Sequence, residues 1–458
     1  MSRSSADLGS GNVRKLLFSL ALPTITSQIV NMLYNLVDRV YIGRIAPVET
    51  VGKLALTGVG VCMPIILIIS AFSSLMAAGG APRASIAAGR GEPEQSEAIL
   101  GSCFTMLLCT SAVLTVLFSV FAEDLLLLFG ASENTIGYAL SYIRIYVLGT
   151  VFVQLTLGMN TYITAQGFTS VSMKTVLIGA GLNTVLDPIF IFLLDMGVEG
   201  AALATVLSQA VSACWVLRFL TGKTTRWKLR RENLRPRARV VLPCIALGLA
   251  PFIMQSTESL LSVSFNSSLQ KYGGDMAVGA MTILTSIMQF AMMPLQGLTQ
   301  GAQPIISFNF GARNAQRVRD AFRVLLTACV TYSMVMWTLV QLLPRVFVGI
   351  FTPDAALIEY AAWAVRIYMA ATGIFGIQIA CQQTFIALGN AKTSLFLAVL
   401  RKIILLIPLI FILPHFFEDQ VFAVFLAEPV SDTLAVATTA VLFSLQFKKA
   451  MKAMEPAP

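Results

Sequence analysis

The chain has 458 residues, of which 56% are hydrophobic and only 12% are charged, and its formal net charge is +9. A soluble domain carries about a quarter charged residues, so this composition excludes a soluble binding module. Hydrophobic runs of transmembrane length recur along almost the whole sequence, whereas a β-barrel would show short alternating segments. The sequence therefore predicts an all-α, polytopic membrane protein whose main partner is the lipid bilayer.

Twelve transmembrane helices are expected from these runs. The first run is not a cleaved signal peptide, because it is too long, contains Pro23 and lacks a small-residue cleavage site after it. The expected spans lie near residues 16–40, 52–78, 98–120, 136–163, 174–194, 198–220, 240–266, 277–300, 322–343, 357–387, 394–414 and 421–446.

Basic residues gather in alternate short loops, which is the positive-inside pattern of membrane proteins. The largest such loop, residues 218–239, holds nine Lys/Arg and one acid, Glu232. The opposite loops are mostly acidic or neutral. This pattern predicts that both termini are cytoplasmic, in a multi-pass protein of the inner (cytoplasmic) membrane. The positive charge is thereby accounted for, and no nucleic-acid partner is expected.

Cysteine and histidine usage argues against metal and cofactor chemistry. The seven cysteines all fall within apolar runs and form no CxxC pair, so we expect no disulfide framework, no zinc site and no cofactor. The chain has only one histidine, His415, so metal sites or catalytic triads built on histidine are not expected. The motifs HExxH, GxSxG and GxGD are also missing, so the chain is not expected to be an enzyme.

The chain repeats itself at a fixed distance. Arg144-Ile145-Tyr146 recurs 222 residues later as Arg366-Ile367-Tyr368, and Gly167 recurs at the same offset as Gly389. The shared offset predicts two pseudo-symmetric six-helix bundles of the same orientation. We expect an N-lobe over residues 1–222, a basic cytoplasmic linker over 223–239 and a C-lobe over 240–458. Parallel repeats of this kind place a substrate site at their interface near the midplane.

The first span carries polar residues that a lipid-facing helix would not tolerate. Asn31, Tyr34, Asn35 and Asp38 follow the i, i+3, i+4, i+7 spacing and form one stripe on a helix, with Gln28 just before them. A carboxylate at a helix centre in lipid costs roughly 2.5–3.5 kcal/mol, so Asp38 is expected to face the interior and to have a function. The alternative is that Asp38 lies in the headgroup zone and only ends the helix.

Spans five and six add a second set of polar groups. Asn183 and Asp187 are four residues apart, so one helix face presents an amide and a carboxylate, and Pro188 favours a local bend. Thr205 offers a hydroxyl in span six, although such threonines usually bond to their own turn. Asp38 and Asp187, if adjacent, would titrate as a coupled pair. The oxygens present suit a proton or a small hard cation, and both H⁺ and Na⁺ remain open.

The second half carries different polar groups. Glu258 in span seven is expected to face inward, whereas Glu428 and Asp432 either lie inside span twelve or precede it. Met288, Gln289 and Met292 could line an adaptable pocket or take part in gating, because methionine suits promiscuous binding.

Four motifs together resemble the multidrug and toxic compound extrusion (MATE) transporters of the multidrug/oligosaccharidyl-lipid/polysaccharide flippase superfamily. They are PTITSQIVNMLYNLVDRVYIG, AAGGAPRASIAAGRG, NTVLDP and GVEGAALATVLSQ. The resemblance implies a monomeric inner-membrane antiporter that exports small organic cations, amphipathic compounds and drugs in exchange for H⁺ or Na⁺, by alternating access.

The resemblance also implies roles for individual residues. Asp38, Asn183, Asp187 and Thr205 match the cation or proton site of one branch of the family, and Pro23 matches its helix-one bend. Glu258 lies near an acid of other members, but their partner acid in helix ten is missing here. We therefore expect the coupling site in the N-lobe.

Two other functions make different demands on the sequence. A lipid-linked oligosaccharide flippase of the same superfamily would need cationic side chains within its spans to face a pyrophosphate. Here Lys392, Arg401 and Lys402 are assigned to the surroundings of the loop after span ten, and the only basic residues within spans, Arg144 and Arg366, stand near their ends. This assignment disfavours a flippase. An intramembrane enzyme is disfavoured because it lacks a nucleophile–base set.

Overall fold

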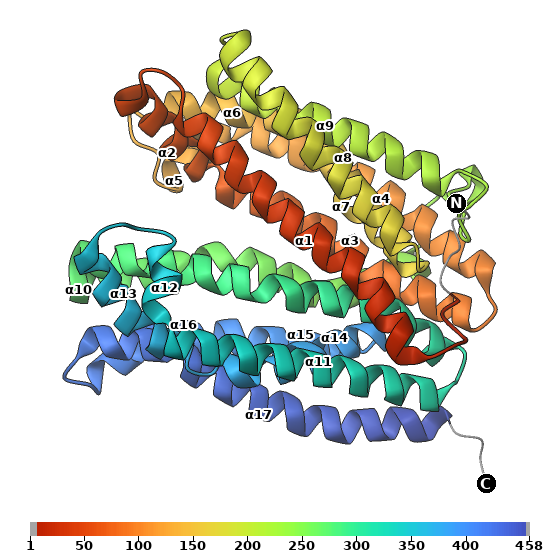
Figure 1. Cartoon of the computed structure of the whole chain (residues 1–458). Helices are drawn as coiled ribbons and strands as arrows, with labels where there is room; N and C mark the ends of the chain where they lie inside the picture. The colour runs from red at the N-terminus through yellow and green to blue at the C-terminus, as the bar shows by residue number, and fades with distance from the viewer. Residues whose placement is uncertain (1–6, 455–458) are drawn as a thin grey trace. The chain divides into compact units, whose positions relative to one another are not determined.

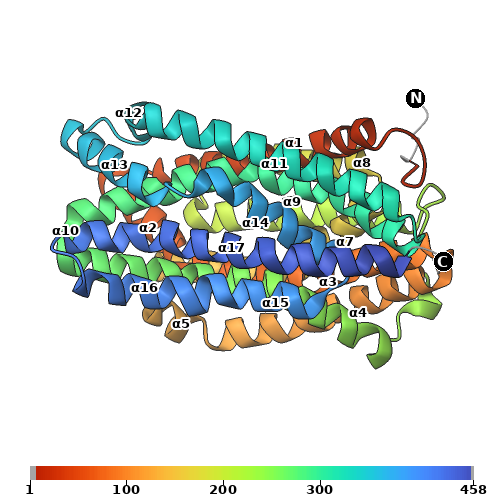
Figure 2. The same ribbon diagram turned by 90° about the horizontal axis from the view of Figure 1, so that it is seen from below.

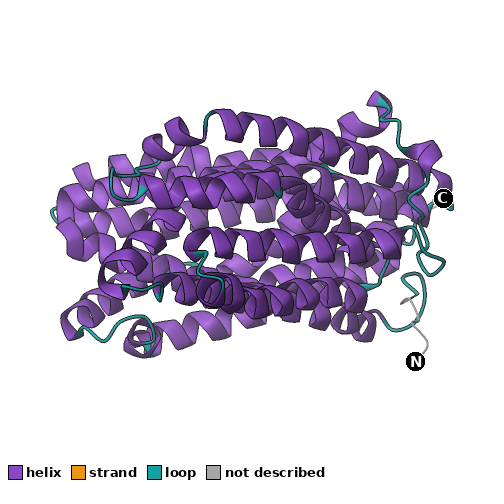
Figure 3. Ribbon diagram, turned by 90° about the horizontal axis from the view of Figure 1, so that it is seen from above, coloured by secondary structure: helices purple, strands orange, loops and turns teal. Residues whose placement is uncertain are grey.

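The computed structural model describes residues 7–454, which form helices and loops without any strand (Figure 3). The helices of the first half are α1 (Val13–Gly43), η1 (Val48–Gly52), α2 (Lys53–Val61), α3 (Met63–Gly89), α4 (Pro93–Val120), α5 (Ala122–Leu128), α6 (Ile136–Leu148), α7 (Thr150–Ala165), α8 (Thr169–Pro188), η2 (Ile189–Leu193) and α9 (Gly197–Leu220) (Figure 1).

The second half follows a short helical turn, η3 (Arg231–Asn233). Its helices are α10 (Ala238–Gly311), α11 (Ala315–Leu342), α12 (Pro344–Gly349), α13 (Ala355–Tyr368), α14 (Thr372–Ala387), α15 (Ala391–Val399), η4 (Leu400–Leu406), α16 (Ile407–Ile412), η5 (Leu413–His415) and α17 (Gln420–Met454). The elements α15, η4, α16 and η5 form one span that runs beside α17 (Figure 2).

The predicted membrane spans are all present. By length and composition, nine helices within residues 7–454 are able to cross a membrane, or eleven when each of two bent pairs is counted as one span. The 74-residue α10 is itself two helices that meet at Gly274, where φ is +66°. Dividing α10 there gives the twelve spans that the hydrophobic runs predict, and the fold class is confirmed.

The repeat is visible in the helix boundaries. Helices α4 and α11 begin 222 residues apart and end 222 residues apart, and α7 and α14 do the same. Spans four and ten are both bent, by 57° between α6 and α7 and by 49° between α13 and α14. Each bend follows an Arg-Ile-Tyr tripeptide, so the sequence repeat corresponds to a repeated local structure.

Contacts divide the described chain into two compact units. The first comprises Asp7 and residues 26–248, and the second comprises residues 8–25 and 249–454. The beginnings of α1 and α10 thus each belong to the unit of the other half. The predicted domain boundaries at 222/223 and 239/240 are drawn from the position of the basic loop, whereas these units are defined by contacts in space. The predicted boundaries therefore stay a prediction.

Glycines explain this exchange of helix ends. A Cβ at Gly248 in the first turns of α10 would overlap the backbone of Leu75 on α3, in the first unit. A Cβ at Gly301 in the second part of α10 would meet the backbone of Ala21 on α1, in the second unit. Thr24 adds a hydrogen bond from its Oγ1 to the Gly297 carbonyl, at 2.6 Å. Backbones approach this closely only where a side chain is absent.

The basic linker is docked on the first unit rather than free. The Gln166 Oε1 atom accepts hydrogen bonds from Thr225 Oγ1 at 2.8 Å, from the Arg226 amide at 2.7 Å and from the Trp227 amide at 3.0 Å. Glu97 accepts a bond from the Lys228 amide at 2.9 Å, and Arg230 pairs with its carboxylate at 2.8 Å. Gln166 and Trp227 are 0% and 3% exposed, so the linker covers polar groups that would otherwise be unpaired.

Candidate functional site

The first unit brings the two predicted acids of the first half together. Asp38 lies on α1 and Asp187 on the last turn of α8, and their carboxyls are close enough to share a hydrogen bond. Asp187 is 0% exposed, and Asp38 is half-buried five residues before the end of α1. Asp38 therefore does not end its helix, and its carboxyl meets that of Asp187.

Asn183 fixes one side of this pair. Its Nδ2 donates a 2.6 Å hydrogen bond to Asp187 Oδ2 across one turn of α8, as the four-residue spacing predicts. The Oδ1 atoms of Asp38, Asn183 and Asp187 are buried, and none has a hydrogen-bond partner within the described residues. Three unpartnered acceptors close together are unusual, because a buried oxygen without a donor costs about 1–3 kcal/mol. They are the kind of group that a proton or a small cation would satisfy.

Two tyrosines lie near the pair, and a third stacks on one of them. Tyr34 lies one turn before Asp38 and within electrostatic range of both carboxyls. Tyr142 on α6 lies near Asp38 and Tyr34, and its ring stacks on that of Tyr146 with centroids 5.9 Å apart. The polar stripe identified Tyr34, but sequence reasoning missed Tyr142 and Tyr146. The available signal was the repeated tripeptide that ends at Tyr146.

The other predicted residues of the first half have different surroundings. Asn35 is exposed, and its Nδ2 donates to the Asn31 carbonyl of its own helix at 2.8 Å. Gln28 and Asn31 are half-buried, and Thr205 is 5% exposed on α9. The polar stripe thus divides: Asp38 meets Asp187 with Tyr34 nearby, whereas Asn35 is exposed.

Two proline expectations concern helix bends. Pro23 lies inside α1, two residues before the point where α1 passes from the second unit to the first. Pro188 ends α8, and the helix continues as the π-helical turn η2. A change of helical winding therefore follows Pro188 directly, next to Asp187, and the predicted bend there stays a prediction.

The donor set suits H⁺ or a hard monovalent cation better than a transition metal. Carboxylate and amide oxygens are the ligands of hard cations. Within residues 7–454, no group of three or more His, Cys, Asp or Glu side chains is arranged to hold a metal ion.

In the second unit, the sequence-based assignment of Arg401 and Lys402 is wrong. Arg401 and Lys402 do not lie around a loop but in the middle of the span Ala391–His415, on the π-helical segment η4. Their side chains are 11% and 5% exposed. Arg401 pairs with Asp432 at 2.7 Å and with Glu428 at 3.2 Å, so both acids lie inside the protein and within α17. The expectation that basic residues stand only near span ends is wrong.

Lys402 makes a separate ion pair with Glu258, and its Nζ also donates to the Met254 carbonyl at 2.9 Å. The Glu258 side chain is 55% exposed, so it is less enclosed than its predicted inward orientation implied. Of the predicted pocket residues, Met288 is half-buried against the core of this unit, Met292 is half-buried and Gln289 is exposed.

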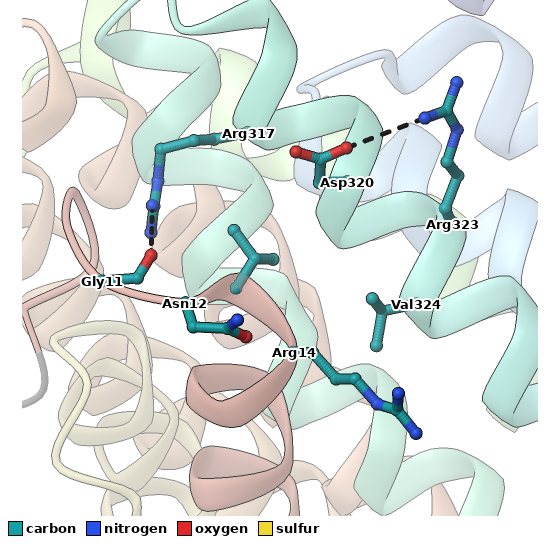
Figure 4. Close-up of a pocket in the computed structure, with 8 residues that line it drawn as sticks. Gly11, Asn12, Arg14, Arg317, Asp320, Arg323 and Val324 are labelled. Atoms are coloured by element: carbon teal, nitrogen blue, oxygen red, sulfur yellow. Dashed lines mark hydrogen bonds and ion pairs between the residues drawn. The ribbon is translucent and has the colours of Figure 1, made fainter.

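A pocket of about 470 Å³ lies elsewhere in the second unit, between the start of α1 and the start of α11 (Figure 4). Its lining includes Arg14, Arg317, Asp320 and Arg323. Arg317 donates to the carbonyls of Gly11 at 2.7 Å and Ser10 at 2.9 Å, so it holds the segment before α1 in place. These contacts give Arg317 a structural role.

Comparisons with known proteins agree with the two-part organisation. A family model described as MatE matches residues 23–189 and 251–412. The multidrug export protein MepA of Staphylococcus haemolyticus is 24% identical over 427 residues, which cover 93% of each chain. MepA of Staphylococcus aureus is 24% identical over 405 residues, 88% of each chain. The crystal structure of a MATE protein in the bent conformation matches with a TM-score of 0.91 at 20% identity, covering 98% of this chain and 100% of that one.

Proposed function

The chain belongs to the MatE family of membrane transporters, and we propose that it exports monovalent organic cations and amphipathic drugs in exchange for H⁺ or Na⁺. Two relatives of nearly the same length are named multidrug export proteins, which supports this substrate class. The distribution of basic residues supports a cytoplasmic membrane with both termini inside. Export then carries the substrate from the cytoplasm to the outside of the cell.

The acid pair of the first unit carries the proposal. Asp38 and Asp187 share a site whose three Oδ1 acceptors have no donor among the described residues. Two adjacent carboxylates repel each other, and one added H⁺ or Na⁺ removes that repulsion. The site therefore changes its charge and its hydrogen bonds when it takes up one cation, which is what a coupling site must do.

Asp38 transmits this change through α1. This helix passes from one unit to the other just after Pro23, so a change at Asp38 acts on the helix that joins them. Moving a two-state equilibrium from 1:99 to 99:1 takes about 5.5 kcal/mol of differential binding. One charge crossing 100 mV supplies only about 2.3 kcal/mol. The coupling ion must therefore bind the two states very differently, and the buried acid pair offers the means.

Replacing the first acid tests the coupling role. Asp38→Asn keeps the shape of the side chain and removes its charge, so cells carrying it should lose ethidium efflux while the protein remains in the membrane at wild-type amounts. Wild-type efflux by this variant would refute the site. Transport into proteoliposomes, with a Na⁺ gradient and a pH gradient imposed separately, identifies the coupling ion. Only one of the two gradients should drive ethidium uptake.

A flippase for a lipid-linked pyrophosphate is the second candidate, since Arg401 and Lys402 do lie within a span. Three acids, Glu258, Glu428 and Asp432, pair with these two bases. A pyrophosphate would meet a cluster whose positive charge is already neutralised. The efflux function is therefore better supported.

A further inference from the structure

We propose that Glu258 forms a binding site for an organic ammonium ion in the second unit, and that Lys402 occupies this site as a tethered cation which the ligand must displace. The class of ligand rests on the proposed efflux function. The site itself rests on the ion pairs, burial and charge of five side chains around η4.

The exposure of the pair is strongly asymmetric. Lys402 is 5% exposed and Glu258 is 55% exposed, so the carboxylate stands at an open edge with the ammonium behind it. Glu258 lies near the middle of the first helix of α10, well away from both Ala238 and Gly274. A carboxylate at that depth is expensive in lipid, so its open side faces water. The exposed carboxylate is therefore the part of the ion pair that a ligand would meet first.

The neighbouring ion pairs have a different form. Arg401 is held between Glu428 and Asp432, whose side chains are 7% and 3% exposed, and its guanidinium lies 4.4 Å from the centroid of the Phe375 ring. That arrangement is almost fully enclosed and ties η4 to α17. Lys402 instead has Glu258 as its ion-pair partner in the described part of the chain, and this is the one exposed acid of the cluster.

The charge of the cluster leaves room for one more cation. Three acids face two bases, so with all groups ionised the net charge is one negative. When a ligand takes Glu258, Lys402 keeps its bond to the Met254 carbonyl and still has Glu428 within electrostatic range. Displacement therefore does not leave a buried ammonium without compensation.

Polar and soft groups next to the pair suit an organic cation. Gln382 donates from Nε2 to the Met254 sulfur at 3.3 Å and accepts a 3.0 Å bond from Gln378. Gln378 is 1% exposed, and its Oε1 is buried without a donor among residues 7–454. A spare acceptor, a thioether and a carboxylate together match the chemistry of an amphipathic ammonium ion.

The π-helical winding of η4 explains why two adjacent basic residues both reach the cluster. In an α-helix, neighbouring side chains diverge strongly, whereas the wider turn of a π-helix brings them nearer to one face. Such π segments recur at functional sites. Here η4 directs Arg401 to α17 and Lys402 to α10.

Competition by a tethered group has a measurable signature. A group on a short tether competes at an effective concentration of about millimolar, so removing it should tighten ligand binding by about tenfold or more. The test is equilibrium binding of radiolabelled tetraphenylphosphonium to the purified full-length protein in lipid nanodiscs. We expect Lys402→Met to lower Kd at least tenfold and Lys402→Arg, which keeps the cation, to bind like the wild type.

Two further variants complete the test. Lys392→Met removes a charge from the exposed surface of α15 and should leave Kd unchanged. The charge-neutral double variant Glu258→Gln/Lys402→Met removes the site without leaving a buried charge unpaired, and it should bind at least tenfold more weakly than the wild type. This variant keeps the test decisive even where Lys402→Met alone does not fold.

Specific results would overturn the inference. They are an unchanged or weaker affinity in Lys402→Met, or wild-type affinity in the double variant. If wild-type cells expel tetraphenylphosphonium while the Kd values of the wild type, Lys402→Met and the double variant are equal, the inference fails and the proposed function stands. If neither the wild type nor Lys402→Met binds the cation, both fail.

Discussion

Replacing Arg401 by methionine should destabilise the second unit strongly. Its Nε and Nη2 atoms contact Asp432 at 2.7 Å and Glu428 at 3.2 Å, and its guanidinium lies over the Phe375 ring. Methionine fills most of the same volume and removes only the charge and the hydrogen bonds. The variant therefore leaves two buried carboxylates without their cation.

The magnitude follows from burial. Removing one partner of a buried ion pair costs about 3–5 kcal/mol, because the other charge stays desolvated. The lost cation–π contact adds about 0.5–2 kcal/mol. With roughly 2–4 °C of melting temperature per kcal/mol for a unit of this size, the Tm should fall by at least about 6 °C.

A matched control is available at the protein surface. Arg345 pairs with Glu359 at 2.8 Å, but the two side chains are 70% and 60% exposed. An exposed pair contributes about 0–1 kcal/mol, so Arg345→Met should change the Tm little. Thermal unfolding of both variants in detergent can be followed by tryptophan fluorescence, since Trp363 packs against Phe425 of the same unit.

Neutralising the acids should reverse the effect in part. Adding Glu428→Gln and Asp432→Asn to Arg401→Met replaces two unpaired charges by amides, so the triple variant should melt higher than Arg401→Met alone. A surface pair accounts for at most about 4 °C, from about 1 kcal/mol at about 4 °C per kcal/mol. The reasoning is refuted if Arg401→Met melts within about 2 °C of Arg345→Met.

Three further variants test other parts of the structure. Asn183→Leu removes a hydrogen bond to a charged group, worth about 1.5–3 kcal/mol, so ethidium efflux should fall about tenfold or more. Equal efflux in Thr184→Ala and Asn183→Leu would contradict this. Gln166→Leu removes the acceptor that three linker donors share, so trypsin should cut residues 222–239 faster than in the wild type. An unchanged cleavage rate would argue against docking. Gly301→Val has no room beside α1, and wild-type yield and Tm would disprove that close packing.

Local patterns allowed much of the fold to be predicted. Hydrophobic length gave the twelve spans, and the 222-residue offset predicted a repeat that recurs in the ends of α4, α7, α11 and α14. The Asn183–Asp187 bond also follows from spacing alone, because residues four apart meet on any α-helix. These features depend on neighbours along the chain, which a sequence displays directly.

The assignment of Arg401 and Lys402 shows where such patterns mislead. Both positions fall inside the predicted span 394–414, but the charge pattern assigns them to the surroundings of the loop after span ten, because charged residues rarely lie within membranes. Their burial becomes possible only because Glu258, Glu428 and Asp432 approach from α10 and α17. The partners that compensate a buried charge lie far away in the sequence.

The sequence by itself determined the class of protein, the order of its spans, its internal repeat and the acids worth testing, since hydropathy and helical spacing are local properties. Only the tertiary structure decided that Asp38 meets Asp187, that Tyr142 joins them, and that Lys402 lies behind Glu258. The reason is physical: whether a charge is tolerable, paired or available to a ligand depends on what packs against it. That packing joins helices which the chain keeps far apart.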